Sequence, residues 1–459
     1  MKKLDCFKAY DIRGKVPEEL DEELCYKIGL AYSHIIKPKT VIVGYDVRLE
    51  SKELSRALIE GLLIGGSNVI NIGLCGTEEV YFHTFNNEPI GVGGGIMVTA
   101  SHNPKGYNGM KMVSRGSRPI SMSGNLKEIR DYVINSEESY PQITGAITRK
   151  RQTINEDKTD YILHLTQYIN IKKLKKLKIV VNPGNGPAGI IIKLLEKILP
   201  FEIIYINEEP DGNFPIGVPN PMIVENRKAT SEAVIQNNAD LGIAWDGDFD
   251  RCFLFDEEGK FIEGYYIVGL LAKSFLKKKQ RSKIVHDPRL IWNTIDIAKE
   301  YGGIPILSKS GHSFIKEKMR DEDAIYGGEM SAHHYFKDFS YCDSGMIPWL
   351  LICELISEGR SLSSLISASM NKFPCSGEIN YPAKNAADIM VRVEEHFRKQ
   401  NPHIDRIDGL SLEFDNWRMN LRSSNTEDLL RLNIETRGES ESIRELISEV
   451  EKIINANFG

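Results

Sequence analysis

Residues 39–63, KTVIVGYDVRLESKELSRALIEGLL, combine a short apolar strand, a polar turn and an amphipathic helix. The strand is a continuous run of apolar residues, whereas the apolar residues of the following segment recur at helical spacing. A strand that is apolar on both faces needs cover on both faces. This stretch therefore predicts an α/β unit in which the strand is buried and the helix packs on its sheet.

The same order of features occurs twice more along the chain. The further copies are KLKIVVNPGNGPAGIIIKLLEKIL at 176–199 and SKIVHDPRLIWNTIDIAKEY at 282–301. The first and third copies also share an Asp-x-Arg turn, formed by Asp46/Arg48 and Asp287/Arg289. One α/β unit used three times, with strands alternating with helices, predicts largely parallel or mixed sheets covered on both faces.

The last part of the chain follows a different pattern. Residues 410–424, LSLEFDNWRMNLRSS, alternate apolar and polar positions as an antiparallel strand should, and residues 440–458 form a clean amphipathic helix pattern. These features predict a small α+β domain at the end of the chain. Candidate domain boundaries lie near residues 147, 256 and 368.

Composition limits the classes of function. The net charge of -6 over 459 residues and a pI near 6.0 argue against a general binder of nucleic acid or anionic membranes. The seven cysteines are scattered and form no CxxC pair, which is typical of a reducing cytosol. We read neither a signal peptide nor an apolar run of about 20 residues, and so we expect a cytoplasmic protein.

A cluster of carboxylates directly follows the apolar segment LGIAW. Asp246, Asp248 and Asp250 stand at alternate positions and would share one face of an extended chain. Three hard oxygen ligands suit Mg²⁺. An EF-hand loop is disfavoured because Arg251 replaces the required glycine and CFLF (252–255) is strand-like. An aspartyl-phosphate enzyme stays open, while a plain polar turn is disfavoured by the clustered negative charge.

A hydroxyl beside an imidazole stands in the glycine-rich stretch 91–113. Glycines permit close backbone approach, and Pro104 stiffens the chain after Ser101 and His102. A Ser-His pair by itself is more often an ordinary turn, and no GxSxG elbow supports acyl transfer. Together with the carboxylate cluster, however, Ser101 predicts phosphoryl transfer, provided that the two loops meet.

Gly184, Gly186 and Gly189 spell GxGxxG between a strand and a helix, with Glu208 farther along the chain. This pattern favours an NAD-dependent oxidoreductase as an alternative from another class. Pro187 offers no amide where a pyrophosphate would need one, so a tight strand-to-helix turn is the preferred interpretation.

Two later loops carry groups that suit a phosphosugar. In GGEMSAHHYF (327–336), Glu329 and Ser331 suit vicinal hydroxyls, and at most one of His333 and His334 should face a ligand, the latter being at least as well explained as a core residue. The loop LRSSNTEDLLRL (421–432) suggests a clamp for a distant phosphate, because guanidinium groups and hydroxyls match phosphate oxygens. Its candidate residues are Arg422, Ser424, Asn425, Thr426 and Arg431.

Taken together, these motifs make the chain resemble the α-D-phosphohexomutases along nearly its whole length. TASHNP, DGDFDR, GEMSAH and RSSNTE look like the phosphoserine, magnesium, sugar-recognition and phosphate-binding loops of that family, and KAYDIRGK (8–15) looks like its N-terminal signature. The resemblance implies four domains: three related α/β domains with mixed sheets and a C-terminal α+β domain. We expect them at residues 1–147, 148–256, 257–368 and 369–459.

Within the family, GEMS and the stretches 76–82, 286–296 and 343–351 resemble the phosphomannomutase branch. The resemblance implies interconversion of mannose 6-phosphate and mannose 1-phosphate through a phosphoserine and a 1,6-bisphosphate, supplying GDP-mannose synthesis. A dual-specificity phosphomannomutase/phosphoglucomutase is the alternative. Asp428 departs from the family, which often has proline there.

The resemblance also assigns roles to residues. Ser101 would carry the phosphoryl group and, with the three aspartates, bind Mg²⁺; His102, Lys111 and Arg13 would serve proton transfer and charge balance. Lys111 would need a depressed pKa to act as a base. The residues expected to contact substrate are Tyr10, Arg251, Arg289, His312, Glu329, Ser331 and His333, with Arg422, Ser424, Asn425, Thr426 and Arg431 at the distal phosphate.

The implied partners follow from these roles. We expect a small phosphosugar substrate, glucose or mannose 1,6-bisphosphate as activator, no nucleic acid or membrane, and a monomer or weak homo-oligomer. A non-catalytic phosphosugar-binding relative should show a broken serine or metal loop, and both loops are whole here.

Overall fold

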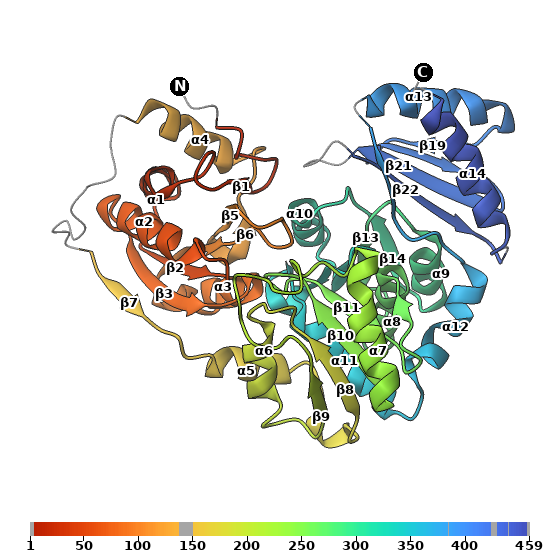
Figure 1. Ribbon diagram of the computed structural model, residues 1–459, viewed down its shortest axis with the longest axis horizontal. Helices are drawn as coiled ribbons and strands as arrows, with labels where there is room; N and C mark the ends of the chain where they lie inside the picture. The colour runs from red at the N-terminus through yellow and green to blue at the C-terminus, as the bar shows by residue number, and fades with distance from the viewer. Residues whose placement is uncertain (1–3, 137–149, 384, 424–428, 439, 457–459) are drawn as a thin grey trace. The chain divides into compact units, whose positions relative to one another are not determined.

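The computed structural model describes residues 4–136, 150–383, 385–423, 429–438 and 440–456. The chain divides into two compact units (Figure 1). The first unit comprises the chain up to Phe261 together with Asp338–Gly359, and the second comprises Ile262–Lys337 and Arg360–Gly459. Each unit is described by itself.

The first sheet of the first unit has the strand order β1-β5-β4-β2-β3-β7, with β6 paired to β5. Strand β2 pairs in parallel with β3 and β4, whereas β5 is antiparallel to both β1 and β4, so the sheet is mixed as predicted. Its strands are β1 (Ile12–Lys15), β2 (Thr40–Tyr45), β3 (Asn68–Leu74), β4 (Val92–Val98), β5 (Tyr107–Ser114), β6 (Arg118–Pro119) and β7 (Gln152–Ile154). Its helices are α1 (Glu22–Ile36), α2 (Ser51–Ile64), α3 (Thr77–Asn86) and α4 (Asn125–Asn135).

Helices cover both faces of this sheet. Val41 and Val43 of β2 lie in the core formed with α1, α2 and α4, whereas Ile42 lies in a second cluster with Val80 of α3. Because successive side chains of a strand point to opposite faces, a strand buried on both sides must be apolar throughout. This explains the continuous apolar run in the first repeat.

The second sheet of the first unit has the order β11-β10-β8-β9, in which β8 pairs in parallel with β9 and β10. Its strands are β8 (Lys178–Asn182), β9 (Glu202–Tyr205), β10 (Leu241–Trp245) and β11 (Cys252–Phe255). The helices of this part are α5 (Thr159–Thr166), α6 (Ala188–Leu195), α7 (Lys228–Asn237) and α11 (Met346–Ser357). Two very short strands are β17 (Cys342–Asp343), just before α11, and β12 (Phe261–Ile262), where the chain passes from one unit to the other.

The third repeat opens the second unit. Its strands run in the order β14-β13-β15-β16, with β13 parallel to β14 and β15. They are β13 (Lys283–His286), β14 (Ile304–Leu307), β15 (Tyr326–Gly328) and β16 (His334–Phe336). The helices are α8 (Gly264–Lys278), α9 (Trp292–Glu300), α10 (His312–Glu322) and α12 (Leu362–Lys372).

The C-terminal part of the second unit is an antiparallel sheet with two helices, the α+β arrangement that the sequence predicts. The strand order is β18-β22-β21-β20-β19. The elements are β18 (Ile379–Pro382), α13 (Ala386–Phe397), β19 (His403–Asp405), β20 (Leu410–Glu413), β21 (Trp417–Ser423), β22 (Leu429–Thr436) and α14 (Ser442–Asn455).

One local prediction is wrong: the stretch 410–424 was predicted as one strand, but its described residues, 410–423, form a hairpin. The amide of Phe414 donates to the carbonyl of Trp417 at 2.9 Å and closes the turn at Asp415 and Asn416. Leucines of β20 and apolar residues of β21 enter the same core. The alternation therefore continues across the turn, because both strands present the same face inward.

Each repeat places one loop at the same point of its sheet. Strand β4 lies in parallel beside β2, β10 beside β8, and β15 beside β13. The loop after each of these strands leaves from the carboxyl edge of the sheet, where α/β proteins bind ligands. These are the serine loop, the metal loop and the sugar loop of the sequence analysis.

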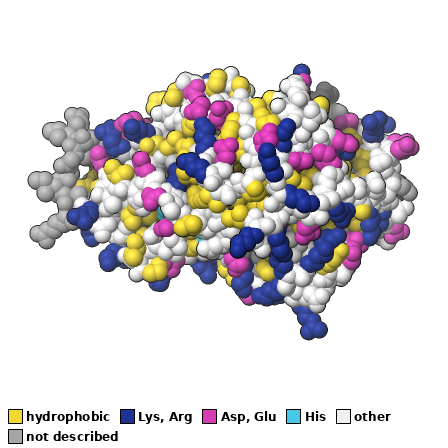
Figure 2. All heavy atoms as spheres, turned by 90° about the horizontal axis from the view of Figure 1, so that it is seen from below, with side chains coloured by type: hydrophobic (Ala, Val, Ile, Leu, Met, Phe, Trp, Pro, Cys, Tyr) yellow, Lys and Arg dark blue, Asp and Glu magenta, His cyan; other side chains and the backbone are white. Residues whose placement is uncertain are grey.

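The surface is mixed in charge. On the face drawn in Figure 2, basic and acidic side chains are interspersed, in keeping with the nearly balanced totals of 58 and 64. Among the described residues, no helix combines the length and apolar character that crossing a membrane requires.

Candidate active site

The serine loop, residues 99–104, begins directly after β4. Ser101 is only 1% exposed and adopts a left-handed backbone conformation, with φ of 49°. Such a conformation costs a non-glycine residue about 1–3 kcal/mol and persists only where the surroundings hold it. The amide of Ser101 donates to Oγ1 of Thr99 at 2.8 Å, which is one of the interactions that hold it.

Two arginines hold the serine loop through its backbone. Arg13 of β1 donates to the carbonyl of Ala100 at 2.5 Å and to Oδ1 of Asn103 at 2.6 Å. Arg48, from the turn after β2, donates to the carbonyl of Ser101 at 2.7 Å. Arg13 thus contacts the serine loop, which carries the hydroxyl that it was predicted to assist.

The metal loop, residues 246–250, follows β10 but is not extended. Phe249 has a φ of 45°, and its amide donates to the carbonyl of Asp246 at 3.1 Å, so the chain turns. The prediction that the carboxylates share one face because the chain is extended is therefore wrong, since the chain is not extended here. The turn nevertheless brings carboxylate oxygens of Asp246, Asp248 and Asp250 within 4.8 Å of one another.

The serine and metal loops converge, as the sequence analysis requires. Oγ of Ser101 donates to Oδ2 of Asp246 at 2.9 Å, across 145 positions of sequence. The backbones also touch, since a Cβ at Gly247 would overlap the carbonyl oxygen of Ser101. Only glycine fits at that position without displacing the serine loop.

Cationic side chains surround the carboxylates. Nζ of Lys111, on β5, lies 2.6 Å from Asp248 and also hydrogen-bonds Asp250, while Nε of Arg251 lies 3.4 Å from Asp246. Although burial opposes it, the two aspartates raise the pKa of Lys111. The depressed pKa that a lysine base would need is therefore absent, and Lys111 is an ammonium group in this arrangement.

The carboxylates themselves fit a divalent cation. Burial, together with Asp250 and Asp248, raises the pKa of Asp246 to about 7. The Oδ1 atoms of Asp246 and Asp248 are buried without a hydrogen-bond partner among the described residues. Buried carboxylate oxygens without donors are costly unless a cation binds them. Hard oxygen ligands in this number favour Mg²⁺.

His102 lies beside the serine hydroxyl. Its Nδ1 is 3.1 Å from Oγ of Ser101, and its side chain is 32% exposed. Partial burial and the cations Arg251, Arg13 and Lys111 lower the pKa of its imidazole well below the usual value. The neutral imidazole is therefore the favoured form of His102.

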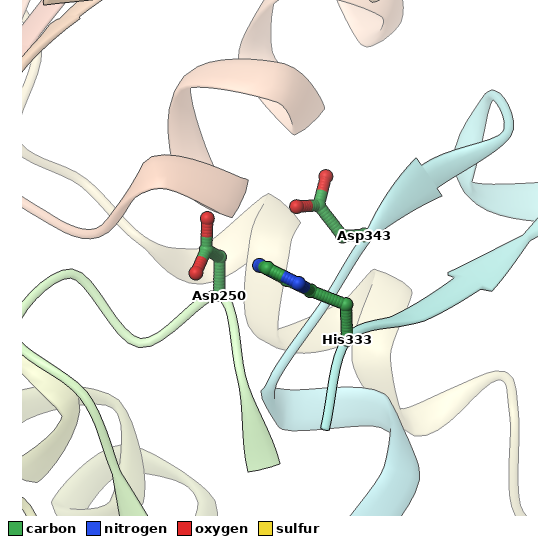
Figure 3. A group of neighbouring side chains, drawn as sticks. All are labelled: Asp250, His333 and Asp343. Atoms are coloured by element: carbon green, nitrogen blue, oxygen red, sulfur yellow. The ribbon is translucent and has the colours of Figure 1, made fainter. Parts of the chain in front are cut away.

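Two residues near the metal loop were not predicted. Thr77, at the start of α3, donates from Oγ1 to Asp248 at 2.5 Å, and its amide donates to the carbonyl of Asp248 at 3.0 Å. Asp343 of β17 has a carboxylate oxygen within 4.8 Å of Asp250; both are labelled in Figure 3. The stretches 76–82 and 343–351 had been noted only for their resemblance to one branch of the family.

The sugar loop follows β15 in the second unit. Arg289, from the turn after β13, donates to Oε1 of Glu329 at 3.2 Å and to Oγ of Ser331 at 3.1 Å. His333, the third residue labelled in Figure 3, has Nδ1 at 3.3 Å from Oε2 of Glu329. Despite burial, His333 and Arg289 lower the pKa of Glu329, which is ionised. The predicted sugar-binding groups thus lie together, held by one guanidinium.

The neighbouring histidines divide their roles as the sequence suggests. His334 is buried, and its Nδ1 is 2.7 Å from the hydroxyl of Tyr326, whereas its Nε2 has no hydrogen-bond partner among the described residues. His312 begins α10 directly after Gly311, whose amide donates to Oε1 of Glu329 at 2.9 Å. His312 therefore adjoins the sugar loop through the backbone of its neighbour.

The predicted phosphate clamp is described in part. Nη2 of Arg422 and Nη1 of Arg431 each lie 3.5 Å from the carboxylate of Glu378, which also lies 3.4 Å from Arg289. The three arginines lower the pKa of Glu378 against the effect of burial. Ser424, Asn425, Thr426 and Asp428 lie outside the described residues.

Tyr10 is half-buried in the bend before β1, three positions from Arg13. It therefore lies beside the edge strand of the sheet that carries the serine loop. Its role in substrate binding stays a prediction.

The glycine-rich turn at 184–189 does not offer a pyrophosphate site. The amides of Gly184, Asn185 and Gly186 already donate to Asn182, Asn207 and Pro183. Gly186 also packs closely on the carbonyl oxygen of Gly247 in the metal loop. This arrangement confirms the tight-turn interpretation. The EF-hand alternative is also excluded, because residues after the metal loop form strand β11.

A serine hydroxyl held against a buried carboxylate cluster, on repeated α/β units, defines a phosphoryl-transfer enzyme of mixed α/β architecture. Four family models match the chain: phosphoglucomutase/phosphomannomutase alpha/beta/alpha domains I, II and III at residues 5–139, 159–259 and 263–373, and the C-terminal domain at 378–453. The chain belongs to the phosphoglucomutase/phosphomannomutase family.

Individual relatives are similar in sequence to this chain over nearly its full length. The chain is 55% identical over 466 residues to a phosphomannomutase of Vibrio cholerae serotype O1, covering 99% of each chain. It is 55% identical over 452 residues to phosphohexose mutases of Xanthomonas campestris pv. campestris, covering 98% of this chain and 99% of the other. A solved family member from Burkholderia thailandensis has a TM-score of 0.87 at 28% identity, covering 100% of this chain and 99% of the other.

Proposed function

We propose that this chain is a phosphomannomutase, which interconverts mannose 6-phosphate and mannose 1-phosphate through a phosphoserine at Ser101 and a 1,6-bisphosphate. The relatives named phosphomannomutase at 50–55% identity support the substrate. The observation that carries the chemistry is the 2.9 Å contact between Oγ of Ser101 and Asp246 within the carboxylate cluster.

Asp246, Asp248, Asp250 and Ser101 would hold Mg²⁺, whose charge would stabilise the transferring phosphoryl oxygens. The chain's own cations supplement that charge. Lys111 and Arg251 bring positive charge to the carboxylates beside the serine hydroxyl, at 2.6 Å from Asp248 and 3.4 Å from Asp246 respectively. Arg13 keeps the serine loop in place through Ala100 and Asn103.

In the transfer step, a sugar hydroxyl oxygen bonds to phosphorus as the bond from phosphorus to Oγ of Ser101 breaks. The hydroxyl proton passes through His102, whose Nδ1 lies 3.1 Å from Oγ, to the serine oxygen that the transfer releases. The reverse transfer from the other end of the bisphosphate restores the phosphoserine and returns the proton.

The second unit would recognise the substrate. Glu329, Ser331, His333, Arg289 and His312 would hold the sugar, with Tyr10 from the first unit's N-terminal segment also assigned to the substrate. Arg422 and Arg431, with Ser424, Asn425 and Thr426 of the same loop, would hold the phosphate that is not reacting. One distal phosphate site serves both orientations of the bisphosphate, since either phosphate can occupy it while the other reacts.

The remaining expectations stand as part of this proposal. Glucose or mannose 1,6-bisphosphate would activate the enzyme by phosphorylating Ser101, and the product would supply GDP-mannose synthesis in the cytoplasm. The protein would act as a monomer or weak homo-oligomer, without nucleic acid or membrane partners. Dual specificity for mannose and glucose phosphates is the alternative, because these sugars differ only at C2.

Replacement of Ser101 tests the proposal. Ser101→Ala should lower turnover by roughly 10⁴-fold or more while leaving the thermal unfolding curve intact, because the residue transfers the phosphoryl group itself. The matched control is Ser123→Ala, which changes an exposed serine whose hydroxyl lies 2.9 Å from that of Ser121. Retained turnover in Ser101→Ala would refute a phosphoserine mechanism.

Two further measurements separate the alternatives. Phosphopeptide mass spectrometry after incubation with the bisphosphate should find phosphate on Ser101; label on an aspartate of the metal loop instead would support the aspartyl-phosphate mechanism. A coupled assay that compares mannose 1-phosphate with glucose 1-phosphate, with the bisphosphate present, decides between single and dual specificity. Absence of turnover with both sugars would favour a binding protein.

A further inference from the structure

The Asp-x-Arg turn after β2 has no part in the mechanism above, yet its arginine contacts the reacting loop more extensively than any residue named there. The guanidinium of Arg48 is buried, with the residue only 4% exposed. It donates to backbone carbonyls of the serine loop and of the first residue of β5. These are the carbonyls of Ser101 at 2.7 Å, Asn103 at 2.6 Å and Pro104 at 3.0 Å in the loop, and of Tyr107 at 3.0 Å in β5.

The aspartate of the same turn holds the other end of the loop. Asp46 accepts from the amide of Arg48 at 3.0 Å and from Oγ1 of Thr99 at 2.7 Å. Thr99 in turn accepts from the amide of Ser101 at 2.8 Å. Asp46 and Arg48 therefore bracket the left-handed residue Ser101, one from the start of the loop and the other from its carbonyl side.

The guanidinium is itself fixed from the opposite side. Its central carbon lies 5.4 Å from the ring centroid of Phe214, and Gly212 packs on the carbonyl oxygen of Val47 with no room for a Cβ. An aromatic face excludes water from the guanidinium while tolerating its charge. Arg48 is thus held between the aromatic ring and the serine loop.

We propose that Arg48 is a positioning residue for phosphoryl transfer, which holds Ser101 in its strained conformation so that Oγ stays on the metal loop through repeated phosphorylation. This inference rests on the proposed function. A loop that alternately carries a hydroxyl and a phosphoryl group needs a support that contacts neither. Arg48 meets this need because its contacts with the loop are to the backbone carbonyls of Ser101, Asn103 and Pro104. A lysine cannot replace it, since an ammonium group lacks the planar fork of five donors.

The test is Arg48→Lys, which keeps the charge but removes the fork. We expect kcat to fall by about 100-fold, because a displacement of about 1 Å at a reacting atom has that effect. KM for mannose 1-phosphate should change little, since the sugar and distal phosphate residues belong to other loops. The uptake of phosphate by Ser101 from the 1,6-bisphosphate, followed by intact-protein mass, should slow in parallel with kcat.

The control is Arg56→Lys on helix α2, where the arginine is exposed and pairs with Glu53 on its own helix. Thr99→Val is a second and milder variant. It removes one hydrogen bond at each side of Thr99 and should lower kcat by about 10-fold with KM unchanged. If Arg48→Lys does not give a cooperative unfolding transition, the kinetics of Thr99→Val decide the question.

The outcomes distinguish this inference from the proposed function. A folded Arg48→Lys with wild-type kcat and wild-type phosphate uptake overturns the positioning role, as does a rise in KM that accounts for the whole loss of kcat/KM. A wild-type protein that takes up no phosphate at Ser101 overturns the proposed function instead. A fall in kcat and uptake at constant KM, absent from Arg56→Lys, supports the inference.

Discussion

The Asp-x-Arg turn occurs twice in the molecule, once after β2 in the first unit and once after β13 in the second. In both copies the aspartate accepts from the amide of its arginine, at 3.0 Å for Asp46 and 2.9 Å for Asp287. In both, the arginine then extends to the loop after the neighbouring parallel strand. Local sequence thus builds the same turn in both places.

The two guanidinium groups nevertheless donate hydrogen bonds to different kinds of acceptor. Arg48 donates to main-chain carbonyls and so determines the shape of the serine loop. Arg289 donates to side chains, including Glu329 and Ser331, and so determines where the sugar-binding groups point. Two copies of one turn therefore contact different groups, backbone carbonyls in one unit and side chains in the other, and the partner loop decides which.

The turn of the middle repeat has no arginine. Asn182 makes the equivalent turn by accepting from the amide of Gly184 at 3.1 Å. There the metal loop is contacted by Gly186, which lies against the carbonyl oxygens of Gly247 and Asp246. Close backbone packing thus stands where the other two repeats have a guanidinium group.

If the first unit carries the chemistry, a metal-loop variant should have the largest effect. Asp248→Asn removes one carboxylate charge, and we expect kcat to fall by about 1,000-fold with loss of Mg²⁺ binding. Titration with Mn²⁺ monitored by electron paramagnetic resonance measures the second effect directly. Asp160→Asn, on the exposed side of α5, is the control. Full Mn²⁺ affinity in Asp248→Asn would contradict the assignment of the metal site.

If the second unit carries recognition, Arg289→Lys should affect binding more than turnover. A single ammonium cannot reach Asp287, Glu329 and Ser331 together, so we expect KM for mannose 1-phosphate to rise about 10-fold while kcat changes far less. Steady-state kinetics beside the exposed control Arg444→Lys measure this. A loss confined to kcat would remove the contrast between the two arginines.

A smaller effect is expected at Thr77, which supports Asp248 without lying in the metal loop. Thr77→Val keeps the side-chain volume but removes the 2.5 Å hydrogen bond to Asp248. Support of this kind changes metal affinity by about 10-fold, which calorimetric titration with Mg²⁺ would detect. Thr84→Val is matched closely, because Thr84 is buried on the same helix and bonds only to the carbonyl of Val80 in its own turn.

A further effect concerns the pH dependence of stability. Glu78 of α3 accepts from Ser344 at 2.8 Å and from the amide of Met346 at 3.1 Å, yet burial raises its pKa from 4.5 to about 8. The folded state therefore retains a proton that the unfolded chain releases at lower pH. Stability should fall as the pH rises from about 4.5 to about 8.

Removal of this group should flatten that dependence. The decrease in Tm between about pH 5 and about pH 9 should be smaller in Glu78→Gln than in wild type, although the amide is less stabilising overall because it offers one acceptor oxygen. Differential scanning calorimetry provides the measurement, with the exposed Glu53→Gln as control. Parallel curves for wild type and Glu78→Gln would show that Glu78 does not titrate in this range.

The sequence by itself determined the features that depend on short stretches of chain. The repeat of strand, turn and helix predicted the α/β units, because periodicity reports which faces are buried. Ser101 and the aspartates of the metal loop were found by residue type, since few side chains can carry phosphate or bind a hard cation. The hairpin at 410–423 was missed because alternation does not reveal where a chain reverses.

Only the tertiary structure decided which distant groups meet. Lys111 lies on the carboxylates because β5 pairs beside β4, and that contact raises the pKa that a lysine base would need lowered. Thr77, Arg48 and Glu378 acquire their partners from elements far away in sequence. The physical reason is that charge, burial and hydrogen bonding act through space, whereas periodicity and residue type are properties of the local chain.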